Sequence, residues 1–484
     1  MRMLIDSEWV EASDGTRTEV RNPATGEIID SVPQASLGDG RRAVEAALRG
    51  KERMARLPAH ERAAILFRTA RAMEENLDEL ARLLAGENGK PLLQTTEEVR
   101  AAIRILWGFG EEAKRIIGRV IPMDAVPGME RHLAMAVRQP VGVVAAIVPF
   151  NYPVELYAHK GAAALAAGNA VIAKPPTECP LTLLRIAEML EEAGLPQGAH
   201  QMLPGPGVPV GEFLASTEGV DLVTVTGSVG TGRRISELAS ATLKSVHLEL
   251  GGNDALIVCD DADLEKAAEA VVLGRLARGN GQICCAVKRV LVDAPSFDDL
   301  AEILTEKAKA LRVGDPLEPG TDVGPLITTE AAERVEAFID EAVAAGAKVR
   351  TGGHRRDAFI EPTVLTEVSP AIPLFREEVF GPVAPLVPFH SVDEAVAVAN
   401  DTPFGLQAAV FTKDISRAFD IAYRLQVGGV VVNWSSAVRV ENVPFGGVKF
   451  TGHGREGLHD TMELMTRQKS ILVHDALSGA FEER

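Results

Sequence analysis

The sequence predicts an α/β fold with two domains built on parallel sheets and a small projecting β ribbon. Two observations predict the sheets. Short apolar runs alternate with helical segments from about Gly142 onward, and a second series of this kind begins near Asp254. The third observation is a length of 484 residues, which exceeds one ordinary domain and suggests two or three.

The region from about residue 38 to residue 117 has the periodicity of helices. Apolar residues recur at helical spacing with charges between them, as in Ala63-Ala64-Ile65-Leu66 and Ala101-Ala102-Ile103. We expect three long amphipathic helices here.

The first series of strands consists of short apolar runs at 143–149, 170–173 and 222–225, with a helical stretch at 181–193. Such runs indicate a parallel sheet covered on both faces. Ligands bind beyond the carboxyl ends of the strands in these sheets. Because Asn151, Lys174 and Ser228 each lie just after a run, we expect them on one rim.

A second series of strands begins near Asp254 and continues through Val290, Val349 and Ala408 to Val432. A helical segment at 331–345 interrupts it. We expect a second α/β domain, which carries Cys284.

The segment 118–141 is β-prone and contains Pro122, Pro127 and Gly128. This pattern predicts a hairpin or ribbon that projects from the first domain.

Composition restricts the class of protein. An apolar content of 46% with 24% charged residues is typical of a soluble globular chain, and the net charge of −18 argues against nucleic acid as a partner. Four cysteines do not form a disulfide framework and fit a reducing compartment. We expect a cytoplasmic protein, because neither a secretory signal nor a membrane-length apolar run is present. No cluster has metal-ligand spacing, so no metal site is expected.

Two short motifs carry the chemistry. Cys284 ends Gly281-Gln282-Ile283-Cys284, and Glu249 precedes two glycines in Leu248-Glu249-Leu250-Gly251-Gly252. A thiolate that adds to an aldehyde gives a tetrahedral adduct, which can expel hydride to a nicotinamide and leave a thioester for an activated water to cleave. The pair therefore suggests covalent oxidation of an aldehyde.

Cys285 directly follows the candidate nucleophile. Neighbouring residues on an extended segment point to opposite sides, so only one of the two cysteines is expected to face a given pocket. We assign Cys285 to packing.

Further motifs follow in a fixed order: Pro149-Phe150-Asn151, Lys174-Pro175, Gly227-Ser228, Glu377-Glu378-Val379-Phe380-Gly381-Pro382 and Pro444-Phe445-Gly446-Gly447-Val448-Lys449. Together with the Cys284 and Glu249 motifs, they make the chain from about residue 5 to its end resemble the aldehyde dehydrogenase superfamily. Lys174-Pro175-Pro176-Thr177 and Ala286-Val287-Lys288-Arg289 resemble the branch of non-phosphorylating glyceraldehyde-3-phosphate and lactaldehyde dehydrogenases. Ile283 departs from the arginine that the glyceraldehyde-phosphate enzymes carry.

The resemblance implies an aldehyde dehydrogenase-like fold with two Rossmann-like domains and an oligomerisation ribbon. Residues 1–117 and 142–248 would bind the dinucleotide, and residues 249–440 would form the catalytic domain. The ribbon 118–141 and the tail 460–484 would form a subunit interface in a homodimer or homotetramer.

The resemblance also implies catalytic roles. Cys284 would attack the aldehyde, Asn151 and the backbone N–H of the nucleophile would hold the oxyanion, and Glu249 would activate water. The presence of Glu249 favours release of a free acid over transfer to coenzyme A. A thiol esterase-type hydrolase, a coenzyme A acylating dehydrogenase and a binding protein on the same fold remain alternatives.

For the cofactor, the resemblance assigns Lys174 to the adenosine ribose, Ser228 to a helix N-terminus beside a phosphate, Glu378 to the nicotinamide ribose and Phe380 to the ring. The full set expected around the cofactor is Val148, Pro149, Phe150, Lys174, Pro175, Thr177, Gly207, Gly227, Ser228, Leu250, Gly251, Glu378 and Phe380. NAD-preferring relatives often carry glutamate at the position of Thr177. We therefore expect NADP as the preferred cofactor, with NAD as the alternative and Glu178 as a competing negative charge.

The residues expected near the substrate are Tyr152, Trp107, Ile283, Trp434 and Arg439. Arg439 lies where a substrate-anchoring loop is expected and could pair with an anionic tail. Arg100 is a weaker candidate for that contact. We expect a medium-sized aldehyde with a polar or anionic end.

Overall fold

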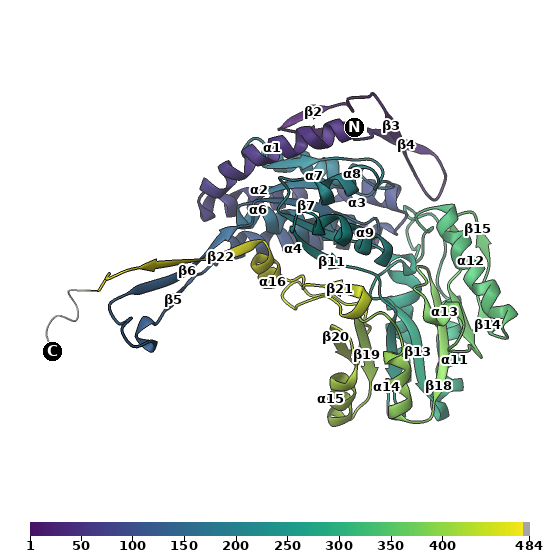
Figure 1. The fold of residues 1–484 in the computed structure, drawn as a ribbon. Helices are drawn as coiled ribbons and strands as arrows, with labels where there is room; N and C mark the ends of the chain where they lie inside the picture. Colours follow the sequence, from purple (N-terminus) through teal and green to yellow (C-terminus); the bar gives the residue numbers. More distant parts are fainter. Residues whose placement is uncertain (478–484) are drawn as a thin grey trace.

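The computed structural model describes residues 1–477, and the chain folds into two α/β domains with a projecting ribbon (Figure 1). The α/β class predicted from the sequence is confirmed. The end of the expected tail, residues 478–484, lies outside the described residues. None of the helices in the described residues is long and apolar enough to cross a membrane.

The first domain is built on a sheet with strand order β2-β1-β9-β8-β7-β10-β11-β21, in which β7 to β11 run parallel. Its strands are β1 (Met3–Ile5), β2 (Glu8–Val10), β7 (Val143–Ile147), β8 (Ala170–Lys174), β9 (His200–Met202), β10 (Leu222–Thr226), β11 (Ser245–Glu249) and β21 (Gly452–His453).

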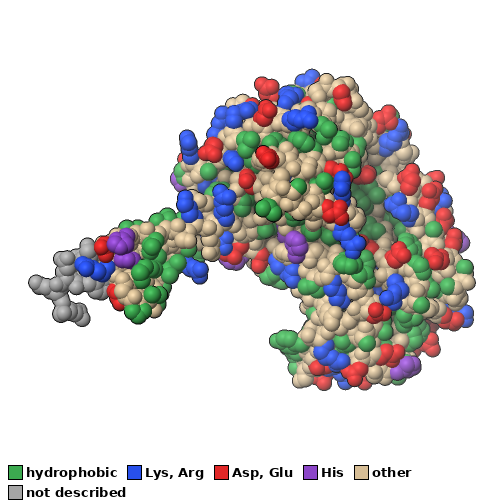
Figure 2. Space-filling model, viewed as in Figure 1, with side chains coloured by type: hydrophobic (Ala, Val, Ile, Leu, Met, Phe, Trp, Pro, Cys, Tyr) green, Lys and Arg blue, Asp and Glu red, His purple; other side chains and the backbone are tan. Residues whose placement is uncertain are grey.

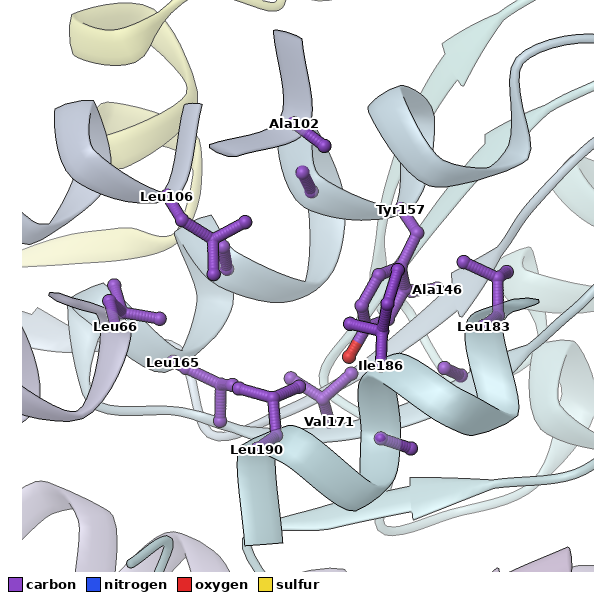
Figure 3. Close-up of a cluster of buried hydrophobic side chains, with 14 of the residues drawn as sticks. Leu66, Ala102, Leu106, Ala146, Tyr157, Leu165, Val171, Leu183, Ile186 and Leu190 are labelled. Atoms are coloured by element: carbon purple, nitrogen blue, oxygen red, sulfur yellow. The ribbon is translucent and has the colours of Figure 1, made fainter. Parts of the chain in front are cut away.

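Helices cover both faces of this sheet. They are α1 (Leu37–Arg56), α2 (Ala59–Glu75), α3 (Leu77–Asn88), α4 (Leu92–Ala113), α5 (Pro153–Tyr157), α6 (Ala163–Ala167), α7 (Leu181–Glu192), α8 (Val210–Ser216), α9 (Val229–Ser240) and α16 (Leu458–Leu464). Val144 and Ala146 of β7 face the core shared with α2, α4 and α7 (Figure 3), whereas Val143 and Ala145 face the core shared with α1 and α8. Burial on both faces explains why β7 has no polar alternation.

The N-terminal region contains four helices, α1 to α4, where we expected three. Pro58 precedes α2, Asn76 separates α2 from α3, and Gly89 ends α3 with φ +86° before Pro91 begins the next helix. The apolar periodicity continues across these short junctions, so it could not show where one helix stops.

The second domain is built on the sheet β14-β17-β18-β13-β12-β19-β20, which is parallel except for β14. Its strands are β12 (Asp254–Val258), β13 (Val287–Asp293), β14 (Lys348–Thr351), β17 (Thr363–Thr366), β18 (Val383–Phe389), β19 (Gln407–Phe411) and β20 (Gly429–Val432). Its helices are α10 (Leu264–Val271), α11 (Phe297–Lys309), α12 (Thr329–Ala344), α13 (Pro373–Arg376), α14 (Val392–Asn400) and α15 (Ile415–Arg424). Two hairpins complete the body, β3 (Arg17–Arg21) with β4 (Ile28–Pro33) and β15 (Arg355–Arg356) with β16 (Phe359–Ile360).

The ribbon is a three-stranded antiparallel sheet of β5 (Arg119–Ile121), β6 (Leu133–Pro140) and β22 (Thr466–Val473), in the order β22-β6-β5. It extends away from the body (Figure 1).

The chain crosses between the two sheets twice. Glu249 is the last residue of β11, so the expected division at residue 248 falls inside that strand of the first sheet. After β20 the chain returns, and β21 pairs with β11 beside Glu249. Residues 441–459, which we assigned to neither domain, include this return.

Candidate active site

A cleft of about 400 Å³ lies at the carboxyl edge of the first sheet and is closed by residues of the second domain. Asn151 follows β7, Lys174 ends β8 and Ser228 follows β10, and all three line this cleft. Cys284 and Glu378 line it from the second domain. Parallel strands place their carboxyl ends on one edge, which explains how residues far apart in the sequence meet here.

The residues expected around the cofactor line this cleft, except Pro175, whose neighbour Pro176 lines it instead. The lining members of the expected set are Val148, Pro149, Phe150, Lys174, Thr177, Gly207, Gly227, Ser228, Leu250, Gly251, Glu378 and Phe380. Glu178 lines the cleft as well, next to Thr177.

The N-terminus of α9 opens onto the cleft. Ser228 is the N-cap, and its hydroxyl accepts the N–H of Thr231 at 3.2 Å. The first N–H groups of a helix have no partner within the helix and attract phosphate. This end of the cleft therefore fits the pyrophosphate of a dinucleotide.

Glu378 is held at the other end of the cleft. Its Oε1 accepts the Gly252 N–H at 3.1 Å and lies 3.0 Å from the Lys288 ammonium. A Cβ on Gly251 would lie 2.0 Å from the other carboxylate oxygen, so only glycine leaves room for this contact. A fixed carboxylate here suits the hydroxyl groups of a ribose.

Lys174 completes the polar lining. Burial lowers the pKa of its ammonium to about 8, and the Nζ donates to the Pro175 carbonyl at 2.8 Å. Lys174, Glu378 and the N-terminus of α9 together offer the donors and acceptors that a nicotinamide dinucleotide requires.

Cys284 lies in a turn before β13, not in an extended segment. The Ala286 N–H donates to the Ile283 carbonyl at 3.3 Å and closes the turn. Cys284 lines the large cleft and a second, narrow cavity of about 40 Å³, and Cys285 lines that second cavity too. The expectation that only one of the two thiols faces a given pocket is therefore wrong, because the turn brings both to the same side.

The two thiols interact. A hydrogen bond with Cys285, followed by burial, raises the pKa of Cys284 well above its usual value, while the nearby Lys288 ammonium opposes this shift. A nearby cation, here the Lys288 ammonium, favours the thiolate form of Cys284.

Two donors face the position above Cys284. The Asn151 amide donates one hydrogen to the Gln282 carbonyl at 3.1 Å, and its side chain lines both cavities. Within residues 1–477, the Cys284 N–H has no acceptor. The second amide hydrogen of Asn151 and this N–H can hold an oxyanion formed on a carbonyl attacked by Cys284.

Glu249 is buried outside both cavities that adjoin Cys284. Its carboxylate lines neither cavity, and its Oε1 lies 3.7 Å from the His247 Nε2. Neither carboxylate oxygen has a hydrogen-bond partner in the described chain. Burial, followed by the charge of Glu456, raises the pKa of Glu249 well above its usual value.

Behind Glu249 lies a buried ion cluster that the sequence analysis missed. Glu456 pairs with the Lys160 ammonium and, at 2.9 Å, with the Arg439 guanidinium. Burial alone would raise the pKa of Glu456, but Lys160 and Arg439 outweigh it and hold that pKa well below its usual value. No spacing rule could find this cluster, because Lys160 and Glu456 lie almost 300 residues apart.

The narrow cavity adjoins Cys284 and Asn151, which it shares with the large cleft. Of the residues expected near the substrate, it is lined by Tyr152, Ile283 and Arg439. Two charged residues that we did not expect, Arg278 and Glu155, also line it.

Arg278 and Tyr152 lie close together in this cavity. The Arg278 guanidinium donates to the Ala437 carbonyl at 2.8 Å and lies 5.8 Å from the centre of the Tyr152 ring. The Tyr152 hydroxyl is buried and has no hydrogen-bond partner in the described chain. Arg439 also lines the cavity, and it shares the single negative charge of Glu456 with Lys160.

Three residues expected near the substrate line neither cavity. Trp107 stacks on Phe67 at 4.6 Å within the helical layer, and Trp434 is 40% exposed just after β20. Arg100 is exposed on α4 and pairs with Glu97. A helix turns its side chains to all sides, so sequence order alone could not place Trp107 and Arg100.

One group of potential metal ligands occurs in the described residues, His132, His474 and Asp475 at the outer end of the ribbon. The His132 Nδ1 already accepts the Asp475 N–H at 3.3 Å. The group lies at the start of β6 and the end of β22, and it lines neither cavity beside Cys284.

Comparisons with known proteins point to one family. The model of the "Aldehyde dehydrogenase family" matches residues 9–471. The chain is 40% identical to a 3-sulfolactaldehyde dehydrogenase of Priestia aryabhattai, with 98% of each chain covered. It is 39% identical to a succinate-semialdehyde dehydrogenase (NADP(+)) of Escherichia coli, with 94% of each chain covered. Among solved structures, an NADP-dependent enzyme of Escherichia coli matches with a TM-score of 0.95 and 38% identity, with 98% of each chain covered.

Proposed function

The chain belongs to the aldehyde dehydrogenase family and is an oxidoreductase that acts on aldehydes, and from this premise we propose that it oxidises a short aldehyde with an anionic end to the carboxylic acid through a thioester on Cys284. A single observation carries the choice of substrate. The Arg278 guanidinium and the unpartnered Tyr152 hydroxyl share a cavity of about 40 Å³ with Cys284.

In the proposed reaction, the Cys284 thiolate adds to the aldehyde carbon and forms a C–S bond. The carbonyl oxygen becomes an oxyanion, which the Asn151 amide and the Cys284 N–H hold. A nicotinamide dinucleotide, which Lys174, Glu378 and the N-terminus of α9 would hold in the large cleft, would supply the hydride acceptor for the two-electron oxidation of the adduct to a thioester. Glu249 then takes a proton from water, the hydroxide adds to the thioester carbon, and the C–S bond breaks to release the acid and the thiolate.

Glu249 must turn toward Cys284 for the last step. In its present position near His247, the carboxylate packs against Gly446, which has no Cβ to exclude it. A Cβ on Gly446 would lie 2.7 Å from the Glu249 Oε1. Replacing Glu249 with Gln should therefore give one equivalent of reduced cofactor per site and then stop at the acyl-enzyme, which intact-protein mass spectrometry would detect.

Turnover assays that measure reduced cofactor and free acid separate the alternative functions. A coenzyme A acylating enzyme would turn over only when coenzyme A is added, and a thiol hydrolase would release acid from esters without forming reduced cofactor from aldehydes. Wild-type turnover that yields free acid without coenzyme A, and that is lost in Cys284→Ala, supports the proposal.

The proposed substrate class rests on the charge of Arg278 and on the size of the narrow cavity. A cavity of this volume admits only a few carbon atoms beyond the aldehyde, and a hydrogen bond to a charged group contributes about 1.5 to 3 kcal/mol. The names of the two relatives, a sulfolactaldehyde and a succinate-semialdehyde dehydrogenase, both describe short aldehydes with an acidic end. Glu155 also lines the cavity and interacts with the Arg278 guanidinium, so an anionic substrate end would compete with Glu155 for it.

The test compares anionic aldehydes with neutral ones of the same length, such as succinate semialdehyde and pentanal. In Arg278→Met we expect kcat/KM to fall roughly 10- to 100-fold for the anionic aldehyde and to change little for the neutral one. Arg100→Met is the matched control, because Arg100 is exposed and pairs with Glu97. An equal loss for both aldehydes would contradict the anionic assignment.

We further propose NADP as the preferred cofactor. The Thr177 hydroxyl donates to the Gly205 carbonyl at 3.2 Å and leaves the cleft without a carboxylate at that position. Thr177→Glu should lower kcat/KM for NADP and spare NAD. A wild-type preference for NAD would point to the neighbouring Glu178 as the discriminating charge.

The ribbon supports a proposal about assembly. Its two outer strands, β5 and β22, carry exposed apolar side chains, of which Val120 is 70% exposed and Leu472 is 57% exposed. Figure 2 shows apolar atoms gathered on the ribbon. A second copy of the chain would cover them, so we propose a homodimer or homotetramer formed through the ribbon.

A further inference from the structure

The segment between α3 and the first turns of α4 contacts both loops that carry the proposed catalytic groups. One loop, residues 148–152, joins β7 to α5 and carries Asn151. The other, residues 279–286, leads into β13 and carries Cys284. We call residues 88–98 the anchor segment.

The anchor segment binds the backbone of the Asn151 loop at consecutive positions. The Asn88 amide donates to the Phe150 carbonyl at 2.5 Å, and the Lys90 ammonium donates to the Asn151 carbonyl at 2.6 Å. A loop of this kind has no ladder hydrogen bonds of its own, so side chains must satisfy its carbonyl groups.

Glu98 continues the contact into α5. Its Oε1 accepts the Val154 N–H at 2.9 Å, and its Oε2 forms an ion pair with Lys90. The Lys90 ammonium also lies 3.9 Å from the centre of the Tyr152 ring. Lys90 and Glu98 are 1% and 2% exposed, so water cannot replace these bonds.

The same segment holds the Cys284 loop from the other side. The Asn280 amide donates to the Gly89 carbonyl at 3.0 Å, and the Gly279 N–H donates to the Gln94 side-chain oxygen at 2.7 Å. One short stretch of chain therefore sets the separation of the two loops, which touch directly through the hydrogen bond from Asn151 to the Gln282 carbonyl at 3.1 Å.

We propose that Lys90, paired with Glu98, is a positioning residue that fixes the Asn151 amide over Cys284. This inference rests on the proposed role of Asn151 as an oxyanion donor. Lys90 binds the main-chain carbonyl of Asn151 itself, so losing the ammonium frees the peptide from which the amide projects. A displacement of about 1 Å at a reacting centre can cost about 10²-fold in rate.

The experiment measures the first-turnover burst of reduced cofactor in Lys90→Met, which keeps the chain length and removes the charge. We expect the burst rate to fall up to about 10²-fold, while KM and cofactor affinity change less than about twofold, because Lys90 itself lines neither cavity. The rate of Cys284 alkylation by iodoacetamide should remain that of the wild type. Lys244→Met is the matched control, since Lys244 also donates to backbone carbonyls, of Leu214 and Thr217, but far from both loops.

A double-mutant cycle separates positioning from general damage. If Lys90 acts through Asn151, Lys90→Met should have no further effect on the burst in an Asn151→Ala background. Equal losses in both backgrounds, or a parallel loss of alkylation, would overturn the inference. If Asn151→Ala alone left the burst unchanged, the oxyanion role itself would fail, which is a distinct outcome.

Removing Lys90 alone leaves Glu98 buried without its partner, which could prevent folding. The double variant Lys90→Met with Glu98→Gln removes both charges and keeps an acceptor for the Val154 N–H. We expect this variant to fold and still to show the slow burst, because nothing binds the Asn151 carbonyl. A wild-type burst in this variant would overturn the inference.

Discussion

At the scale of single residues, the pair Cys284 and Cys285 shows how local backbone decides chemistry. An extended segment would have separated the two thiols, whereas the turn at 283–286 places both against the narrow cavity. A neighbouring thiol that shares a hydrogen bond makes the nucleophile harder to ionise.

Replacing Cys285 with Ala removes this hydrogen bond, so the pKa of Cys284 should fall. Inactivation by iodoacetamide requires the thiolate, and its rate should reach half of its maximum at a lower pH than in the wild type. Cys259→Ala serves as the control, because Cys259 lies on the second domain beside Arg417. A midpoint that stays in place or rises would contradict the shared hydrogen bond.

A second prediction at this scale concerns the effect of the Glu456 charge on the pKa of Glu249. Glu456→Gln removes the anion that raises the pKa of Glu249 and leaves Lys160 and Arg439 without a counter-charge, so the Glu249 pKa should fall. Thioester hydrolysis needs ionised Glu249 and slows as the pH falls through its pKa. The acid limb of the profile should therefore move to lower pH.

Hydrolysis of p-nitrophenyl acetate in single turnovers, over about pH 6 to 9, would give this profile. Glu463→Gln is the control, because Glu463 pairs with Arg138 and lies beside the ribbon. An acid limb that stays in place or moves to higher pH would contradict the predicted effect of the Glu456 charge on Glu249.

Individual site residues were predictable where a motif fixes them. Asn151 and Cys284 lie at a strand end and in a short motif, and the structure brings both to the same cavities. Arg278 lies six positions before Cys284, and nothing in its neighbourhood marks it as different from a surface arginine. The placement of Trp107 and Trp434 depends on which side of an element faces the core, which sequence order does not contain.

At the scale of elements, the parallel strands were predictable because burial on both faces leaves an uninterrupted apolar run. The runs at 143–149, 170–173 and 222–225 correspond to β7, β8 and β10. The junctions between α2, α3 and α4 were not predictable, since a break of one or two residues barely changes a periodic pattern.

One of these helix junctions supports a prediction about stability. Glu87, at the end of α3, accepts the N–H groups of Leu181 and Thr182 at 2.7 and 2.8 Å and so binds the start of α7. Glu87→Ala leaves these donors buried without a partner, which should lower the free energy of unfolding by about 2 to 3 kcal/mol.

Urea unfolding, together with hydrogen exchange at the amides of Leu181 and Thr182, would measure the effect. Glu79→Ala is the control, because Glu79 is exposed and pairs with Arg185. Unchanged protection of those two amides would contradict the predicted role of Glu87.

At the scale of the whole molecule, the ribbon provides a test of assembly. Leu472→Asp places a charge among the exposed apolar side chains of β22, so it should shift the sedimentation coefficient toward that of a monomer. Leu93→Asp is the matched control, because Leu93 is 75% exposed but lies at the start of α4. A wild-type chain that sediments as a monomer would contradict the proposed interface.

The order of the two domains along the chain was predictable from the two series of strands. The return of the chain from the second sheet to β21 of the first sheet was not predictable. The strand β21 has two residues and no apolar run of its own, and it forms only because β11 offers an open edge. Long-range pairing of this kind has no local signal in a sequence.

The two crossings between the domains are bonded to each other. The Leu250 N–H donates to the Thr451 carbonyl at 2.8 Å, and the Thr451 hydroxyl donates to the Gly251 carbonyl at 2.8 Å. A single linker segment can rotate about its backbone bonds. Two linker segments that are hydrogen-bonded side by side form a strip, which resists twisting and mainly bends. Glu249 is the residue at which this strip begins, so the carboxylate proposed to turn toward the thioester lies where the two domains are joined.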